Sequence, residues 1–342
     1  MRKPNIAILG ATGVVGREIT SITTELGVEF NSIKFLSSAK SAGTKIQFQG
    51  KEYTVEEATP EVFDDIDIVM ASAGGGTSKH FAPEIVKRGG VIIDNSSAFR
   101  MDKDVPLVIA YVNDDDLKNH KGIIANPNCS TSQLMLVLKP LHEKAKIKRL
   151  LVSTYQAVSG AGLKAMNELT ANTEATMKGE DFQNEAFKKP ISFNVIPQID
   201  VFEENGYTKE EMKVANETKK ILHLDTDTPI SCTAARVPVY RGHSEAVDIE
   251  FEEDITPDEV REILKNSFGV TVIDDIDNFE YPTTRDADGT DPVFVGRIRK
   301  NLAFKHGISL WCVADNLRIG AALNTVRICK KVTEMGLWGK DR

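Results

Sequence analysis

The sequence is poor in cysteine and contains no long apolar run. Only 4 of its 342 residues are cysteine and none belongs to a C-x-x-C pair. We therefore expect reduced thiols, with no disulfide framework and no metal site. No apolar run approaches the ~18 residues of a membrane span, and the basic start of the chain lacks a signal-peptide cleavage site. These absences predict a cytoplasmic protein that does not cross a membrane.

Positive charge is also scarce. The chain has 42 Lys and Arg against 50 Asp and Glu, which gives a formal net charge of -8. It therefore has no overall positive field to hold nucleic acid or an anionic membrane surface. Binding of a polyanion is not expected to be its main function.

The length predicts two domains and a small additional element, at roughly 150 residues per domain. In the first part, short apolar runs alternate with amphipathic stretches, which is typical of a parallel sheet with crossover helices. After about residue 128, longer β-rich runs predict a separate α+β domain. The expected strands are residues 6–9, 33–36, 45–49, 52–55, 66–70, 91–93, 105–109 and 123–125, followed by residues 149–155, 230–237, 246–251, 293–299 and 309–313.

Two helices of the second part are marked by their first residues. Thr208 and Thr256 each stand three residues before a Glu, the spacing of a capping box, and Pro257 adds a first-turn proline. An apolar stripe over residues 323–335 predicts a final helix. The segment 178–205 has no regular pattern, so it is either a surface excursion or a partner contact.

A glycine-rich turn directly follows the first predicted strand and opens the first predicted helix. Glycines allow a tight turn and let a pyrophosphate approach the helix N-terminus, where amide N–H groups and the helix dipole favour anions. The spacing G-x-x-G-x-x-G differs from the usual G-x-G-x-x-G, and a turn that merely needs glycine is the alternative. The residues expected to bind a dinucleotide here are Gly10, Thr12, Gly13, Val14, Val15 and Gly16.

Two further segments are expected to complete the dinucleotide site. Ala73 and Gly74 follow the strand at 66–70, at the sheet edge where open α/β sheets bind ligands. About 20 residues past the glycine turn, a site that prefers NAD usually carries a carboxylate for the ribose 2'-hydroxyl. Here the sequence offers Ser38, Lys40 and Ser41 instead, which suit a 2'-phosphate. We therefore predict NADP rather than NAD.

Cys129 differs from the other three cysteines. It follows an apolar strand and a proline turn and stands in the first turn of an apolar helical pattern. Amide N–H groups at a helix start stabilise a thiolate, and they can also stabilise an oxyanion on a carbonyl carbon that the sulfur attacks. A thiolate beside a dinucleotide predicts hydride transfer through a thioester. Cys232, Cys312 and Cys329 lie in apolar strands or helices and are expected to be structural.

His243 is the candidate base among six histidines. It follows a predicted strand and stands near Arg236 and Arg241, and Gly242 before it could expose the imidazole. The other five are expected to be incidental surface residues, namely His80, His120, His142, His223 and His306.

Together these segments resemble the aspartate-semialdehyde dehydrogenase family from end to end. The order and spacing of the shared motifs are specific, although several motifs are weak alone. The resemblance implies NADPH-dependent reduction of L-aspartyl 4-phosphate to L-aspartate 4-semialdehyde with release of phosphate. That step serves the biosynthesis of lysine through diaminopimelate and of threonine, methionine and isoleucine. The matching segments are Gly10–Gly16, Asn95–Arg100, Asn126–Thr131, Ser153–Gly162, Glu210–Lys213, Arg236–His243 and Asp315–Ala322.

The resemblance also implies roles for individual residues. Cys129 matches the nucleophile that attacks the acyl phosphate, His243 the acid/base residue, and Gln156 the residue that orients the acyl intermediate. From the residues alone, Glu210 and Lys213 would equally well form a surface i,i+3 ion pair. The implied substrate contacts are Arg236 on the α-carboxylate, Glu210 on the ammonium group, and Arg100, Lys213 and Asn128 on the phosphate, and the implied nicotinamide contacts are Gly160 and Asn316.

The family's architecture gives the expected domains. It implies an α/β fold like that of glyceraldehyde-3-phosphate dehydrogenase, with a Rossmann-type NADP-binding domain over residues 1–128. An α+β catalytic and dimerisation domain would span 129–321, and a C-terminal helix at 322–342 would return to the first domain. The expected assembly is a homodimer or a tetramer.

Three alternatives stay open. N-acetyl-γ-glutamyl-phosphate reductase shares the fold and the chemistry, but its cysteine motif usually reads Asn-Pro-Gly-Cys, whereas here Asn128 precedes the cysteine. Glyceraldehyde-3-phosphate dehydrogenase usually opens with Gly-Phe-Gly-Arg-Ile-Gly, which is absent. A nucleotide-binding protein without catalysis would be expected to have lost Cys129, Gln156, Arg236 or His243, and all four are present.

Overall fold

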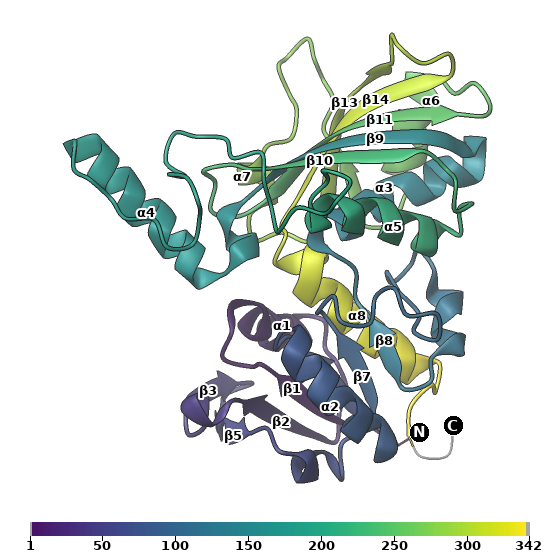
Figure 1. Cartoon of the computed structure of the whole chain (residues 1–342). Helices are drawn as coiled ribbons and strands as arrows, with labels where there is room; N and C mark the ends of the chain where they lie inside the picture. Colours follow the sequence, from purple (N-terminus) through teal and green to yellow (C-terminus); the bar gives the residue numbers. More distant parts are fainter. Residues whose placement is uncertain (1, 340–342) are drawn as a thin grey trace. The chain divides into compact units, whose positions relative to one another are not determined.

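The structure, a computed structural model, describes residues 2–339 and divides into two compact units. The first unit is formed by the chain up to Asn128 together with the chain from Ala321 onward, and the second is Cys129–Gly320. Each unit contains its own six-stranded sheet (Figure 1). Within residues 2–339 no helix is both long and apolar enough to cross a membrane.

The first unit is built on a parallel sheet with the strand order β5-β2-β1-β6-β7-β8. If the six strands of this sheet are numbered 1 to 6 in chain order, the spatial order is 3-2-1-4-5-6. This is the order of a doubly wound dinucleotide-binding fold, in which ligands bind at the carboxyl ends of the strands, where the order reverses. Its central strands β1, β6 and β7 are almost wholly buried, as expected for a parallel sheet covered on both faces, whereas both residues of the edge strand β5 are exposed. The strands are β1 (Asn5–Leu9), β2 (Ser32–Ser37), β5 (Glu56–Glu57), β6 (Ile68–Ala71), β7 (Val91–Asp94) and β8 (Ile123–Ala125), with a separate hairpin of β3 (Lys45–Phe48) and β4 (Lys51–Thr54).

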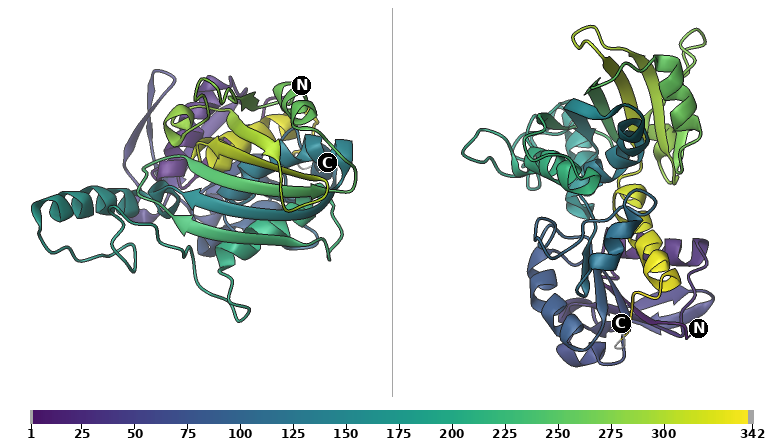
Figure 2. Two further views of the ribbon diagram at one scale, coloured as in Figure 1. Left: turned by 90° about the horizontal axis from the view of Figure 1, so that it is seen from above. Right: turned by 90° about the vertical axis from the view of Figure 1, so that its right-hand side faces the viewer.

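Three helices cover this sheet. Helix α2 (Gly75–Lys87) buries Phe81, Ala82 and Ile85 in one core cluster of the sheet. Helix α1 (Val14–Glu25) packs against α8 (Leu323–Glu334), and α8 also contacts β6 and β7. The predicted final helix is thus confirmed, and it lies beside the strands of the first unit in both figures (Figures 1 and 2).

The strand predicted at residues 105–109 is not present. This buried segment makes only an isolated bridge, from Leu107 to Ala125. Pro106 lacks an N–H for a sheet ladder, and asparagine side chains bind the neighbouring backbone groups instead. Asn113 donates to the Leu107 carbonyl and Asn324 donates to the Val108 carbonyl. The segment makes two backbone hydrogen bonds with β8, both to Ala125, and the asparagine side chains bind other backbone groups of residues 107–110, so no continuous ladder forms.

The second unit contains a mixed sheet in the order β10-β9-β11-β14-β13-β12. Helices α3, α5 and α6 lie on one face of this sheet, where each contacts strands and α3 also packs against both α5 and α6. The left view of Figure 2 looks onto the other face, where the strands are not covered by a helix. The elements are α3 (Cys129–Ala145), β9 (Ile147–Gln156), α4 (Leu163–Lys178), α5 (Lys209–Leu222), β10 (Ile230–Arg236), β11 (His243–Phe251), α6 (Pro257–Lys265), β12 (Val270–Val272), α7 (Thr284–Ala287), β13 (Val293–Lys300) and β14 (Gly307–Ala314). Strand β12 was not predicted.

Both predicted capping boxes are present. The Thr208 hydroxyl accepts the backbone N–H of Glu211, whose carboxylate accepts the backbone N–H of Thr208. Thr256 and Glu259 repeat this arrangement at the start of α6. The start of α5 is therefore well defined, and α5 carries two of the predicted site residues.

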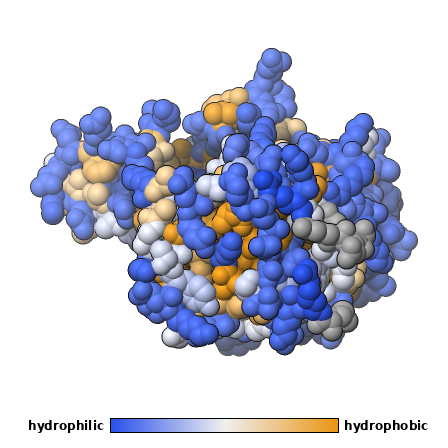
Figure 3. Space-filling model, turned by 90° about the horizontal axis from the view of Figure 1, so that it is seen from below, coloured by the Kyte–Doolittle hydropathy of each residue, from blue (hydrophilic) through white to orange (hydrophobic). Residues whose placement is uncertain are grey.

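The irregular segment 178–205 is attached to α4 by buried polar groups. The Glu168 carboxylate accepts backbone N–H groups of Glu185 and Phe187, and Asn172 accepts the backbone N–H of Ser192. Figure 3 shows hydrophobic residues among the hydrophilic surface of the region formed by α4 and this segment, at the left of that view. Its exposed apolar side chains include Leu163, Met177, Phe193 and Val195.

Candidate active site

The glycine turn after β1 needs glycine for two separate reasons. Gly10 has φ of +86°, and a Cβ there would lie 2.5 Å from the Ser72 carbonyl oxygen. A Cβ on Gly16 would lie 2.1 Å from the Gly10 carbonyl oxygen, because the first turn of α1 crosses directly over the loop. The chain therefore opens α1 at Val14 with its first amide groups unobstructed by side chains, as an anion site at a helix N-terminus requires.

A pocket of about 550 Å³ lies at this turn in the first unit. It contains six of the predicted cofactor residues and also Glu57 of β5, a carboxylate that the spacing argument did not anticipate. Val14, Val15 and Gly16 form the first turn of α1 instead, Gly74 precedes α2, and Lys40 lies in a short 3-10 turn, Ala39–Ser41. The predicted residues that line the pocket are Gly10, Thr12, Gly13, Ser38, Ser41 and Ala73.

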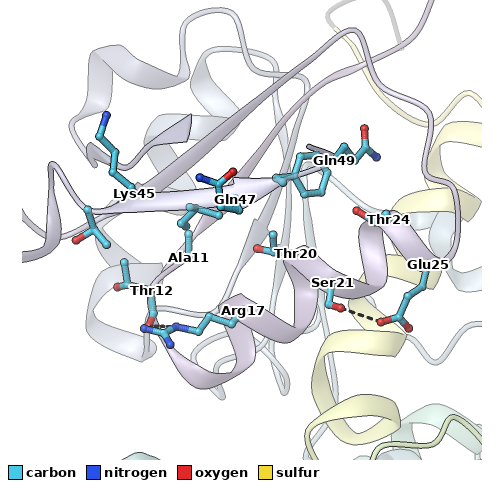
Figure 4. Close-up of a pocket in the computed structure, with 13 residues that line it drawn as sticks. Ala11, Thr12, Arg17, Thr20, Ser21, Thr24, Glu25, Lys45, Gln47 and Gln49 are labelled. Atoms are coloured by element: carbon cyan, nitrogen blue, oxygen red, sulfur yellow. Dashed lines mark hydrogen bonds between the residues drawn. The ribbon is translucent and has the colours of Figure 1, made fainter. Parts of the chain in front are cut away.

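A second pocket of the first unit, of about 590 Å³, shares Thr12 with the first one. Figure 4 shows it between α1 and the strand that carries Lys45 and Gln47. The Arg17 guanidinium donates to the Thr12 carbonyl oxygen and so covers the outer end of the glycine turn. None of the predicted site residues except Thr12 lines this pocket.

Cys129 and His243 meet in the second unit. Cys129 is the first residue of α3 and His243 the first residue of β11. The Cys129 Sγ lies 3.2 Å from the His243 Nε2, and the Ala157 backbone N–H donates to the His243 Nδ1 at 3.1 Å. Since Nδ1 accepts a hydrogen bond, the proton of the neutral imidazole is on Nε2 and points at the sulfur. The arrangement stabilises a thiolate on Cys129.

The imidazole is not exposed, contrary to the sequence-based expectation. His243 has 0% relative exposure. Gly242, with φ of +90°, allows a close approach of the chain to Thr284 rather than opening the ring to solvent. Burial, with the Arg236 charge acting in the same direction, lowers the pKa of His243 well below its usual value. The ring is therefore neutral at physiological pH.

Three predicted residues form one hydrogen-bonded group. Gln156, at the end of β9, donates from Nε2 to the Ser130 hydroxyl at 2.9 Å and to the Glu210 carboxylate at 3.2 Å. Glu210 also pairs with the Lys213 ammonium, at 3.1 Å. Glu210 is only 5% exposed, so the pair is not the surface ion pair that the sequence alone suggested. Burial alone lowers the pKa of Lys213, but the nearby carboxylates of Glu210 and Asp200 outweigh it and raise the pKa.

Arg236 lies over the same region. Its Nη1 donates to the Ala157 carbonyl oxygen at 2.7 Å. Burial lowers its pKa while the charges of Cys129 and Glu210 oppose the shift, and a guanidinium keeps its charge under these conditions. A Cβ on Gly160 would lie 3.1 Å from the Arg236 Nη1 and 3.4 Å from the His243 ring. Gly160 therefore leaves room directly in front of these two side chains.

Asn316 is part of the backbone support of the second unit. Its Oδ1 accepts the Gly242 backbone N–H at 3.0 Å, and its Nδ2 donates to the Ser159 hydroxyl. It is almost completely buried. It thereby holds the residue before His243, in addition to the cofactor contact implied by the resemblance.

Arg100 and Asn128 belong to the first unit. The Arg100 guanidinium donates to the carbonyl oxygens of Asn126 and Asn95 at 2.9 and 2.8 Å. Asn128 is 7% exposed and immediately precedes Cys129 in the chain. Among residues 2–339, no group of three or more His, Cys, Asp or Glu side chains could hold a metal ion.

Sequence reasoning missed three groups in these sites. The Ala157 N–H, which sets the imidazole tautomer, is a backbone group with no sequence signal. Glu57 reaches the cofactor pocket because β5 pairs with β2, where Ser37 faces it. Gln133, which donates to the His243 carbonyl oxygen, stands four residues after Cys129, and helical spacing could have found it.

The two-unit fold agrees with two family models. These are described as semialdehyde dehydrogenase, NAD binding domain, which matches residues 5–120, and semialdehyde dehydrogenase, dimerisation domain, which matches residues 138–319. A nucleotide-binding sheet combined with a cysteine–histidine pair defines an oxidoreductase that uses a nicotinamide dinucleotide.

Individual relatives give the narrower assignment. Aspartate-semialdehyde dehydrogenase of Aquifex aeolicus (strain VF5) is 51% identical over 336 residues, which are 97% of this chain and 98% of that protein. The protein of the same name from Bacillus subtilis (strain 168) is 47% identical over 341 residues, 97% and 98% of the two chains. The structure of aspartate semialdehyde dehydrogenase II complexed with ASA from Vibrio cholerae is similar at a TM-score of 0.94 and 40% identity, covering 98% of this chain and 99% of that chain.

The chain belongs to the aspartate-semialdehyde dehydrogenase family. It is an enzyme of amino-acid biosynthesis, and the non-catalytic alternative is set aside.

Proposed function

We propose that the chain reduces L-aspartyl 4-phosphate to L-aspartate 4-semialdehyde with NADPH, through a thioester on Cys129. The observation that carries the proposal is the 3.2 Å contact between the Cys129 Sγ and the His243 Nε2, with the sulfur at the start of α3. A thiolate held by an N–H donor and a helix N-terminus is an activated nucleophile.

In the proposed reaction, the Cys129 thiolate attacks the acyl carbon, the bond to the phosphate oxygen breaks and inorganic phosphate leaves. A nicotinamide dinucleotide held by the pocket at the glycine turn would supply a hydride in this direction and would accept one in the reverse direction. The carbonyl oxygen carries the developing negative charge, and the positive end of the helix dipole at the start of α3 is suited to stabilise it. When the carbon–sulfur bond breaks, the sulfur leaves as the same thiolate.

His243 acts in this scheme as a hydrogen-bond donor to sulfur. Its Nε2–H stabilises the attacking thiolate, and again the thiolate that leaves when free aldehyde forms. The Ala157 N–H at Nδ1 supports this role, because it disfavours the tautomer in which Nε2 would accept the thiol proton.

The substrate's charged groups have matching partners in the second unit. The Arg236 guanidinium suits a carboxylate, which it can bind with two parallel hydrogen bonds. Glu210 suits the ammonium group, and an acetylated nitrogen would not need it. Lys213 is the proposed phosphate ligand of this unit, and the family resemblance implies the same role for Arg100 and Asn128.

The preference for NADP depends on the pocket beside β2. Ser38 and Ser41 line it, with Lys40 between them, while Glu57 brings a negative charge to the same pocket. We expect Lys40→Ala to raise the KM for NADP roughly tenfold, the value of one charge-assisted hydrogen bond, and to leave the KM for NAD unchanged. Glu57→Gln is the matched variant and is expected to lower the KM for NADP. Equal effects of Lys40→Ala on both cofactors would contradict the assignment.

The open face of the second sheet is the proposed homodimer surface. Leu151 and Tyr155 of β9 are exposed there, and the Tyr155 ring contacts the Trp311 ring at 5.4 Å between centroids. A pocket of about 450 Å³ lies on the same strands, beside Ala246 and Trp311. Analytical ultracentrifugation tests this proposal. A mass of two chains is expected for the homodimer, and a mass of four chains would support the tetramer. The cytoplasmic location remains a prediction, in keeping with four free thiols.

The function is tested by following NADP reduction with L-aspartate 4-semialdehyde and phosphate. Turnover is expected with this substrate and not with N-acetyl-L-glutamate 5-semialdehyde. If only the acetylated aldehyde reacted, the reductase alternative would be right and the role of Glu210 wrong.

A further inference from the structure

A buried polar cluster lies behind the cysteine–histidine pair and takes no part in the mechanism above. It consists of Gln133 on α3, Glu245 on β11 and Cys312 on β14, all with 0% relative exposure. Buried polar side chains cost free energy unless they are hydrogen-bonded, so a cluster of three in one core invites a functional explanation.

Gln133 connects the two elements that carry the pair. It stands four residues after Cys129, on the same face of α3. Its Nε2 donates to the His243 backbone carbonyl oxygen at 3.3 Å and lies 3.9 Å from the Cys312 Sγ. One side chain therefore ties the nucleophile's helix to the histidine's strand within one turn of the sulfur.

Glu245 supports this side chain from the strand. It is two residues after His243, so both side chains leave β11 on the same face. Cys312, its direct partner on β14, donates from Sγ to the Glu245 Oε2 at 3.4 Å. The Gln133 Oε1 and the Glu245 Oε1 are both buried without a hydrogen-bond partner among residues 2–339. A carboxyl O–H on Glu245 would supply the donor that the Gln133 oxygen lacks.

We infer that Gln133 is a positioning residue that holds the His243 main chain at a set distance from Cys129, with Glu245 keeping its amide in that orientation. The inference rests on the roles of Cys129 and His243 proposed above. The 3.2 Å contact between sulfur and Nε2 needs both the ring and the backbone of His243 in place. Ala157 holds the ring at Nδ1, and Gln133 holds the backbone.

Burial raises the pKa of Glu245 to about 8, although the hydrogen bond from Cys312 opposes the shift. The carboxyl is therefore protonated at neutral pH, as the orientation of the amide requires. The titratable groups facing it are Cys312 of β14 and Cys232 of β10, and Cys232 in turn faces Glu210 and Glu211 of α5.

The test uses Gln133→Met, which keeps the length of the side chain and removes the amide. The measurements are kcat, the KM for NADP, the rate at which Cys129 reacts with iodoacetamide at neutral pH, and the melting temperature. We expect kcat and the labelling rate to fall about 10- to 100-fold, because a shift of about 1 Å at a reacting group has effects of that size. The KM for NADP is expected to stay unchanged, since the cofactor pocket is untouched.

Val137→Ala, one turn further along α3 and equally buried, is the control for a purely structural loss. If it lowered kcat and the labelling rate as much as Gln133→Met at a similar melting temperature, the positioning role would be overturned. The labelling arm needs no substrate. A wild-type Cys129 that reacted slowly would therefore refute the proposed nucleophile, whereas fast labelling in both wild type and Gln133→Met would refute only the present inference.

A second pair of variants keeps the test decisive if Gln133→Met does not fold. Glu245→Gln retains a donor for the Gln133 oxygen and is expected to keep the neutral-pH kcat within about twofold, whereas Glu245→Ala is expected to lose activity like Gln133→Met. In the wild type, the labelling rate is expected to change near pH 8 as Glu245 ionises, and Glu245→Gln is expected to lack that change. Equal kcat in the two Glu245 variants, or the same pH profile in Glu245→Gln and wild type, would overturn the role of Glu245.

Discussion

Replacing Cys129 by alanine is expected to lower kcat by about 10⁴-fold or more, because the covalent route is lost altogether. The other three cysteines cannot substitute for it. Cys232, Cys312 and Cys329 are buried, and burial raises the pKa of each thiol, to about 12 for Cys329. Activity is measured as NADP reduction with L-aspartate 4-semialdehyde and phosphate.

Two matched measurements separate loss of the nucleophile from loss of the fold. Cofactor binding, followed by NADPH fluorescence, is expected to be unchanged because the glycine turn is intact. Cys129→Ser keeps the size of the side chain but is also expected to be inactive, since a neutral His243 with its proton on Nε2 cannot take the proton of a serine hydroxyl. A Cys129→Ala protein that retained a fast-reacting thiol and measurable turnover would show that another cysteine is the nucleophile.

The parts of the site carried by local sequence could be predicted. The glycine turn has a local signal, because a strand, a tight turn and a helix follow each other within a dozen residues. Cys129 has one as well, since a proline turn before an apolar helical pattern places it at a helix start. In both cases the structure has the predicted element at the predicted residues.

Groups brought together by long-range pairing could not be predicted. Glu57 enters the cofactor pocket through a two-residue strand beside β2, and no spacing rule finds such a contact. The strand predicted at 105–109 was wrong because the segment pairs with β8 only at Ala125, and the side chains of Asn113 and Asn324 bind its neighbouring carbonyl groups. Asn324 lies more than 200 residues further along the chain. No local pattern in the sequence therefore shows that its side chain binds this segment.

The burial of His243 shows the same limit for electrostatics. Because Gly242 precedes His243, the sequence indicated an exposed imidazole. In the structure this glycine lets the chain pass close to Thr284, and the His243 ring is buried. The same burial that lowers the pKa of this histidine raises the pKa of Glu245 two residues later. His243 and Glu245 of β11 are therefore both neutral where they face α3. The sequence shows one base and one acid but does not show that both are uncharged.

Glu245 makes the stability of the fold depend on pH. Its carboxyl has a pKa of about 8 in the folded chain against a value near 4.3 to 4.5 when unfolded. Between these values the unfolded chain has lost the proton and the folded chain still holds it. The free energy of unfolding therefore falls as pH rises through this window and stays low above it. The total contribution is on the order of 5 kcal/mol for a shift of about 3.5 units, as an upper value.

Glu245→Gln removes this dependence, since glutamine resembles the protonated carboxyl and does not ionise. We expect the variant and the wild type to have similar unfolding free energies at about pH 5, and the variant to be more stable by several kcal/mol at about pH 8.5. Urea denaturation at both pH values measures the difference, and groups that titrate equally in both proteins cancel.

Glu250→Gln on the same strand is the control, because the carboxylate of Glu250 pairs with Lys148 and Arg149 at 3.4 and 3.0 Å. Removing that paired charge is expected to destabilise the fold at about pH 8.5 by roughly 1 kcal/mol or more, the opposite sign to Glu245→Gln. If the unfolding free energies of wild type and Glu245→Gln ran parallel from about pH 5 to 8.5, Glu245 would have to be ionised throughout. The amide of Gln133 would then face a carboxylate, and the orientation inferred for it would have no support.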